Sequence, residues 1–166
     1  MRAEARQMRG PVDDSGADNA AGAERFFALQ FTTGPMQVRA ALEELMACLA
    51  AWAMPGDLIE AAEIVMAEVF NNIEEHAYGA KNSGPIWVSF LALARKLVVT
   101  VSDQGQAPPE DLIRGKCLAD IVPEALPEGG FGWALIRDLV HDLRIFRRDG
   151  VTHLSFTLTF VPERIR

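Results

Sequence analysis

The fold of this chain is decided around one stretch, Ala67-Glu68-Val69-Phe70-Asn71-Asn72-Ile73-Glu74-Glu75-His76-Ala77-Tyr78-Gly79. With about 100° of rotation per residue, the apolar residues in and before this stretch fall on one stripe. That periodicity predicts a helix that packs on a core. The predicted core stripe is Leu58, Ala62, Val65, Val69 and Ile73, and the predicted solvent side is Glu60, Glu63, Asn71 and Glu74.

Three polar residues follow the edge of that stripe. Glu68 and Asn72 are four residues apart, so they lie one above the other on the flank of the helix. His76 continues the line by one turn, and we expect it to lean further toward the core. A carboxylate, an amide and an imidazole in a row can serve as a base, a metal ligand and an anion contact. Ordinary polar flank residues of a helix would give the same pattern.

Composition predicts a single domain. The chain has 166 residues, of which 49% are hydrophobic and 23% charged, enough for one real core. Residues 1–25 have almost no large apolar side chains and are predicted to be a disordered tail, which leaves the domain at residues 26–162. No apolar run reaches the length of a membrane span, and no apolar segment follows the N-terminal arginines as in a secretory signal.

Charge and cysteine usage exclude several classes of function. The net charge of −7 argues against nucleic acid as the main partner. Cys48 and Cys117 have no CxxC spacing, so neither a structural disulfide nor a zinc site is expected, and a reducing cytoplasm is the simplest compartment.

The rest of the chain predicts a mostly antiparallel sheet with helices. A strand is expected at Phe27, Leu29 and Phe31, and Asp57 is expected to cap the helix that carries Glu68. Two β-rich runs, 86–93 and 96–102, predict a hairpin, and the irregular span 103–128 predicts a functional loop or lid. A second hairpin, 144–148 and 151–160, is predicted around Asp149-Gly150. The helix before it is expected to use an apolar face made of Leu135, Ile136, Leu139, Val140 and Leu143.

Two short motifs could bind a ligand. Asp103-Gln104-Gly105 directly follows a strand, and a carboxylate there can accept a hydrogen bond from an exocyclic amine, although Asp-x-Gly is also a common turn. Gly130-Phe131-Gly132 opens a helix, where glycines and free N–H groups favour an anion.

The order of these motifs resembles the Bergerat ATP-binding fold, and within it the bacterial anti-sigma factor serine/threonine kinases. The stretch from Ala67 to Tyr78 fits the family's helix, roughly Ser-Glu-Ala-x-x-Asn-Ala-x-x-His-Ala-Tyr. Gly130-Phe131-Gly132-Trp133-Ala134-Leu135-Ile136-Arg137 looks like its Gly-Arg-Gly-Leu-x-Leu-Ile-Arg. The resemblance covers residues 27–160 and implies an α+β fold, a two-layer α/β sandwich of the histidine-kinase-like ATPase type.

The resemblance also implies roles for single residues. Glu68 would be the general base that takes the proton of a serine or threonine hydroxyl. Asn72 would hold the Mg²⁺ that bridges the ATP phosphates. His76 would approach those phosphates, or else simply be a histidine packed at the helix end. Asp103 would bind the adenine amine, and Gly105 would give the base space. Gly130 and Gly132 would frame the phosphates.

Partners follow from the same resemblance. The family phosphorylates a small anti-sigma-factor antagonist of the STAS type, holds a sigma factor, and usually forms homodimers. Three residues depart from the family pattern: Phe131 replaces a basic residue, Ala107 a glycine and Trp133 a leucine. These departures leave open a second function, a nucleotide-binding switch that transfers no phosphate and acts by partner competition. A histidine-kinase catalytic domain or an ATP-hydrolysing clamp would need further segments that this sequence does not supply.

Overall fold

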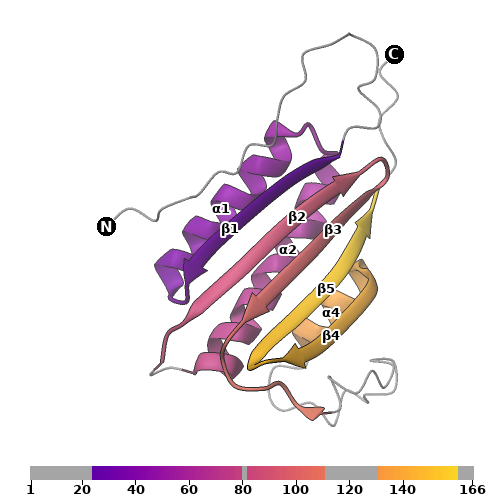
Figure 1. The fold of residues 1–166 in the computed structure, drawn as a ribbon. Helices are drawn as coiled ribbons and strands as arrows, with labels where there is room; N and C mark the ends of the chain where they lie inside the picture. Colours follow the sequence, from indigo (N-terminus) through magenta and orange to yellow (C-terminus); the bar gives the residue numbers. More distant parts are fainter. Residues whose placement is uncertain (1–23, 80–81, 111–130, 161–166) are drawn as a thin grey trace, which may run out of the picture.

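The computed structural model describes residues 24–79, 82–110 and 131–160 (Figure 1). Five strands form one sheet in the order β1-β2-β3-β5-β4, and all neighbours are antiparallel. The elements are β1 (Arg25–Thr32), α1 (Pro35–Ala51), α2 (Gly56–Asn72), η1 (Ile73–Tyr78), β2 (Pro85–Leu93), β3 (Lys96–Asp103), α4 (Phe131–Leu139), β4 (His141–Arg148) and β5 (Val151–Thr159).

The described helices all lie on one face of the sheet, and no described element covers the other face, here called the open face (Figure 1). The core lies between these two layers, because alternate residues of β2, β3 and β5 point toward the helices and are buried. Its largest fully buried side chains include Phe70, Phe90, Phe156, Leu45, Leu49 and Met66. The predicted α+β two-layer sandwich with an antiparallel sheet is confirmed. None of the helices in the described ranges is long and apolar enough to cross a membrane.

Helix α2 follows the predicted stripe closely. Leu58, Ala62, Val65 and Val69 are buried, and Met66 and Phe70 widen the buried face. The predicted cap is wrong: Pro55 occupies the N-cap position, and Asp57 lies in the first turn, where its Oδ1 accepts the N–H of Leu58 at 2.8 Å. Pro55, with a ψ of 144°, has the extended backbone that is usual for the residue before a helix. No side chain makes a capping hydrogen bond at this end of α2.

The last turn after α2 is a π-helix over residues 73–78. The N–H of Gly79 donates to the carbonyl of Glu74, five residues earlier, at 2.9 Å, which is the wider π-helical pattern. The extra residue in the turn rotates the side chains that follow. His76 is therefore exposed instead of leaning toward the core, and Ile73 is only half-buried. Gly79 ends the segment with a φ of 68°, a backbone conformation that favours glycine.

Both predicted hairpins are confirmed. Leu93 pairs with Lys96, and β4 is joined to β5 by Asp149 and Gly150, whose φ angles of 51° and 79° are both positive, as a type I′ turn requires.

The predicted apolar face of the helix before β4 is partly wrong. Helix α4 ends at Leu139, so Leu143 lies in β4, and Leu135 is 40% exposed. The strand begins at His141, three residues earlier than predicted, and it carries a bulge between His141 and Arg144, with Asp142 at a φ of 54°. A bulge disturbs the alternation by which a strand is recognised in sequence.

The predicted tail lies outside the described residues except for its last two, of which Arg25 already begins β1. Gly130 and Cys117, and residues 111–128 of the predicted lid, also lie outside them.

Candidate functional site

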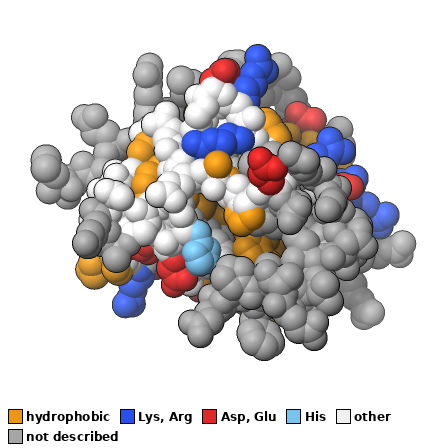
Figure 2. All heavy atoms as spheres, turned by 90° about the horizontal axis from the view of Figure 1, so that it is seen from below, with side chains coloured by type: hydrophobic (Ala, Val, Ile, Leu, Met, Phe, Trp, Pro, Cys, Tyr) orange, Lys and Arg blue, Asp and Glu red, His pale blue; other side chains and the backbone are white. Residues whose placement is uncertain are grey.

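A cavity of about 400 Å³ opens at the end of the sheet where η1, the loop after β3, and α4 meet. Its size is in the range of small-molecule sites. Seen from below, hydrophobic side chains gather in a recess with a histidine and charged side chains around it (Figure 2). Apolar residues from α2 and η1 and from three strands line the cavity: Val69, Ile73, Val101, Ile145 and Leu154. Such walls fit a flat, mostly apolar ring.

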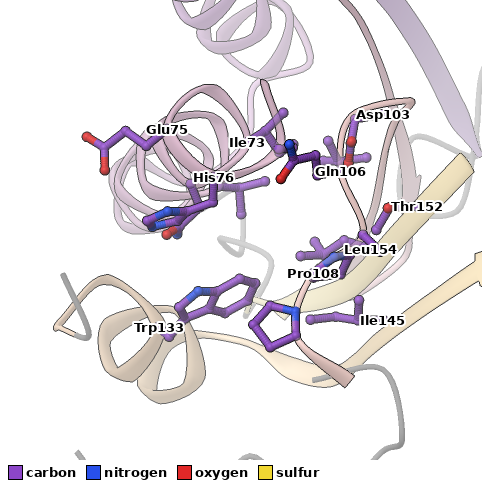
Figure 3. Close-up of a pocket in the computed structure, with 16 residues that line it drawn as sticks. Ile73, Glu75, His76, Asp103, Gln106, Pro108, Trp133, Ile145, Thr152 and Leu154 are labelled. Carbon is purple, nitrogen blue, oxygen red and sulfur yellow. The ribbon is translucent and has the colours of Figure 1, made fainter. Parts of the chain in front are cut away.

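Asp103 lies at one end of this cavity (Figure 3). It is the last residue of β3 and only 4% exposed, and its Oδ1 accepts the N–H of Gly105 at 2.8 Å. Burial raises the pKa of this carboxyl, while the hydrogen bond from Gly105 and the charges of Arg147 and His153 act in the opposite direction. A buried carboxylate with one oxygen already satisfied can offer the other to a ligand donor.

Tyr78 holds the loop that follows Asp103. Its hydroxyl donates to the carbonyl of Pro85 at 2.9 Å and accepts the N–H of Gln104 at 3.0 Å. Burial raises the pKa of this phenol, so it stays a neutral donor. A Cβ on Gly84 would collide with the Tyr78 ring, so the glycine makes room for this bridge.

Gly105 packs directly on the end of the π-helix. A Cβ at this position would lie 2.5 Å from the Cβ of Ala77 and 2.6 Å from its carbonyl oxygen. The next residue, Gln106, donates its N–H to that same carbonyl at 2.7 Å. The glycine is therefore required for the close approach of loop and helix, and Gly105 itself is not among the residues that line the cavity.

The fold brings Glu68, Asn72 and Gly132 together. The amide nitrogen of Asn72 donates to the backbone carbonyl of Glu68 at 2.8 Å, which turns its amide oxygen away from the helix as an available ligand. A Cβ on Gly132 would clash with the Glu68 carboxylate and lie 3.7 Å from the Asn72 nitrogen. Asn72 lines the cavity, and Glu68 lies beside it, one turn earlier on α2.

His76 and Trp133 lie at the other end of the cavity from Asp103 (Figure 3). The exposed imidazole of His76 lies above the indole of Trp133 in this view, whereas the carboxylate of Glu75 points away. Gly130 and the side chain of Phe131 fall outside the described part of the chain.

Three lining residues on β4 and β5 are not identified by the sequence motifs: Ile145, Thr152 and Leu154. Thr152 is buried and pairs with Asp103 across β3 and β5. Thr152 could have been identified from the sequence, because it is a polar residue on the apolar face of its strand. Ile145 could be found only once the pairing of β4 with β5 is known.

The donors present fit a nucleotide with Mg²⁺. Mg²⁺ takes hard oxygen ligands and often uses only one or two from the protein beside those of phosphates and water. The amide oxygen of Asn72 could serve as one such ligand. Within the described residues, no cluster of three or more His, Cys, Asp or Glu side chains could hold a metal without such help.

An antiparallel sheet covered by helices on one face, with a helix asparagine and a strand-end aspartate facing one cavity, defines a histidine kinase-like ATPase domain. The family model of that domain matches residues 31–158. The chain belongs to this family, and within it to the anti-sigma factor kinases.

The relatives named serine-protein kinase RsbW, from Staphylococcus aureus, are similar to this chain. Those of strains bovine RF122 / ET3-1, MRSA252 and JH9 are each 32% identical to it over 114 residues, which are 66% of this chain and 71% of the relative.

Proposed function

We propose that this protein is an anti-sigma factor that uses ATP to phosphorylate a serine or threonine of an anti-sigma-factor antagonist, and so controls the release of a sigma factor. The observation that carries the proposal is the joint placement of Glu68, Asn72 and Gly132 beside a cavity that has Asp103 at its far end. The relatives are named as serine-protein kinases, which supports the same activity.

The base of the nucleotide lies at the Asp103 end. The carboxylate accepts a hydrogen bond from the exocyclic amine of adenine, and the apolar walls at Ile73, Val101 and Leu154 contact its ring. Thr152, the strand partner of Asp103, adds a hydroxyl at the same edge.

The phosphates lie toward α2 and the start of α4. Asn72 would hold the Mg²⁺, which would neutralise charge on the phosphates. Gly132 would let the start of α4 approach them, and His76, exposed at the rim of the cavity, would contact them. Glu68 accepts the proton of the attacking hydroxyl, a contribution of roughly 10²–10⁴-fold in rate.

The open face of the sheet supports a second copy of this chain as a further partner. None of the outward positions of the described strands β1, β2, β3 and β5 is Asp or Glu, although the chain has a net charge of −7. Low charge is typical of the centre of an interface. These four strands of eight or nine residues present about 500 Å², so a pair of copies would bury about 1,000 Å², the lower bound for a specific contact. The outward residues are Phe26, Ala28, Gln30, Thr32, Trp87, Ser89, Leu91, Leu93, Lys96, Val98, Thr100, Ser102, Val151, His153, Ser155, Thr157 and Thr159.

The kinase is tested by phosphate transfer from labelled MgATP to candidate antagonists of the same genome. Wild type, Glu68→Gln and the control Glu63→Gln are compared, because Glu63 is exposed on the same helix. We expect transfer by wild type and Glu63→Gln, and loss of transfer by Glu68→Gln with nucleotide affinity retained. Binding of MgATP without transfer to any antagonist would favour the nucleotide-binding switch instead.

A further inference from the structure

Arg147 connects three strands at the Asp103 end of the cavity. It pairs with Thr152 across β4 and β5, and Thr152 pairs with Asp103 across β5 and β3, so the three residues form one row. The guanidinium donates through Nη1 to the Thr152 hydroxyl at 2.6 Å and through Nη2 to the carbonyl of Gly105 at 2.9 Å. One side chain thus holds both the strand beside Asp103 and the loop after it.

The geometry of the guanidinium matters for this contact. Its two nitrogens are held in a rigid planar fork, so it sets the distance between the β5 hydroxyl and the loop carbonyl. The carbonyl that Arg147 holds belongs to the Gly105–Gln106 peptide, and the N–H that donates to Asp103 belongs to the adjoining Gln104–Gly105 peptide. Holding the first peptide therefore restricts the second through the Cα of Gly105 that they share. Arg147 is not among the residues that line the cavity, so it acts through these neighbours.

The charge of Arg147 has a second effect. Burial raises the pKa of the Asp103 carboxyl, and the positive charge of Arg147 opposes that rise. The other charged or titratable groups that act near this carboxyl are His153 on β5 and Tyr78 on η1. An ionised carboxylate only accepts hydrogen bonds, whereas a protonated one also donates. The state of Asp103 therefore decides whether an amine or a carbonyl on a purine is preferred.

We propose that Arg147 is a positioning residue that holds the Asp103–Gly105 loop in its binding shape and keeps Asp103 an acceptor, so that the site selects a 6-amino purine over a 6-oxo purine. The proposal rests on the proposed function, in which Asp103 receives the base. It assigns selectivity to a side chain that makes no contact with the ligand.

Arg148 provides a matched control. It is the next residue on the same strand, with the same charge, but its side chain is 81% exposed and pairs with Asp149 at 3.4 Å. A change at Arg148 removes the same charge from the protein without touching the loop or Thr152.

The experiment measures the affinities of the full-length protein for ADP and IDP with Mg²⁺ by calorimetry, from pH 5 to pH 8. For Arg147→Met we expect at least tenfold weaker ADP binding, loss of the preference for ADP over IDP, and loss of ADP binding at a higher pH than in wild type. Arg147→Lys keeps the charge without the fork, so it should weaken binding but keep the pH dependence. Arg148→Met should match wild type in every measurement. Should Arg147→Met not fold, Arg147→Gln replaces it.

The outcomes separate the two proposals. If wild type prefers ADP and Arg147→Met keeps the same preference and the same pH dependence, the role of Arg147 is overturned and the proposed function is not. The role of Arg147 in selectivity would also be overturned if Arg147→Met lost ADP and IDP affinity equally with no change in pH dependence. Arg147 would then only stabilise the structure of the site. Wild type that binds neither nucleotide would overturn the proposed function and this inference together.

Discussion

The N–H of Gln106 lies 2.7 Å from the carbonyl of Ala77 and donates to it, which joins the loop after β3 to the π-helical turn after α2. That turn carries His76 and follows Asn72, and the loop follows Asp103, the last residue of β3. One backbone hydrogen bond therefore holds the two ends of the cavity at a set distance from each other. Gly105, which packs on Ala77, is the position at which this junction can be tested.

Gly105→Ala should destabilise the protein and weaken nucleotide binding. The added Cβ would lie 2.5 Å from Ala77, and overpacking of this kind costs about 1–3 kcal/mol. Urea unfolding and ADP calorimetry measure the two effects. Gly56→Ala is the control, because a Cβ there meets nothing within 4 Å. Unchanged stability in Gly105→Ala would show that the loop can move away from the π-helix at no cost.

Asn72→Ala should reduce the gain in nucleotide affinity that Mg²⁺ provides. Its amide oxygen is the ligand assigned to the metal, and loss even of a supporting partner at a metal site costs about 10–100-fold. ADP binding is measured by calorimetry with Mg²⁺ and with a chelator. Asn71→Ala, on the exposed side of the same helix turn, should behave as wild type. An equal effect of Mg²⁺ on Asn72→Ala and on wild type would remove Asn72 from the metal site.

Asp103→Asn should stabilise the folded protein at neutral pH while it weakens ADP binding. The folded state raises the pKa of Asp103, with burial as the main cause, so its ionised form costs stability. That cost is complete above the raised pKa and disappears as the pH falls below the unfolded value of about 3.9. The stability difference between variant and wild type should therefore shrink on acidification, as followed by urea unfolding at several pH values.

Asp149→Asn is the control for that series. Its side chain is 89% exposed, and asparagine also suits its type I′ turn, so its stability should follow that of wild type from neutral to acid pH. If Asp103→Asn were less stable than wild type at neutral pH, the ionised carboxylate would be a net stabilising group.

Leu91→Glu should convert the proposed dimer to a monomer. Leu91 is half-buried on the open face of the sheet, between its strand partners Phe26 and Val98. A carboxylate there must lose water on association, so we expect at least about tenfold weaker dimerisation, or about 1.4 kcal/mol. Sedimentation velocity measures the change, and ADP binding should be kept. Ile64→Glu, which changes an exposed apolar residue of α2, should leave the dimer intact. If wild type were a monomer at all concentrations, the proposed dimer would be wrong.

Much of the fold could be predicted because its signals are local. The apolar period of α2 from Leu58 to Val69, the hairpin turn at Asp149-Gly150, and the β-rich composition of β2 and β3 all depend on residues within a few positions of each other. The errors arose where two local preferences point to different structures. Pro55, and not Asp57, is the N-cap of α2. Leu143 fits the apolar period of a helix but lies in the bulged part of β4.

What the sequence by itself determined is the set of elements and the chemical groups on one helix flank, Glu68 and Asn72, together with Asp103 at a strand end. The tertiary structure decided which groups meet. It placed Gly132 against Glu68, packed Gly105 on Ala77, turned His76 to the surface through a π-helical turn, and brought Arg147 to a carbonyl 42 residues away. Contacts of that separation depend on strand order and register, which no local pattern encodes, because they arise only when the sheet and its helices pack into one core.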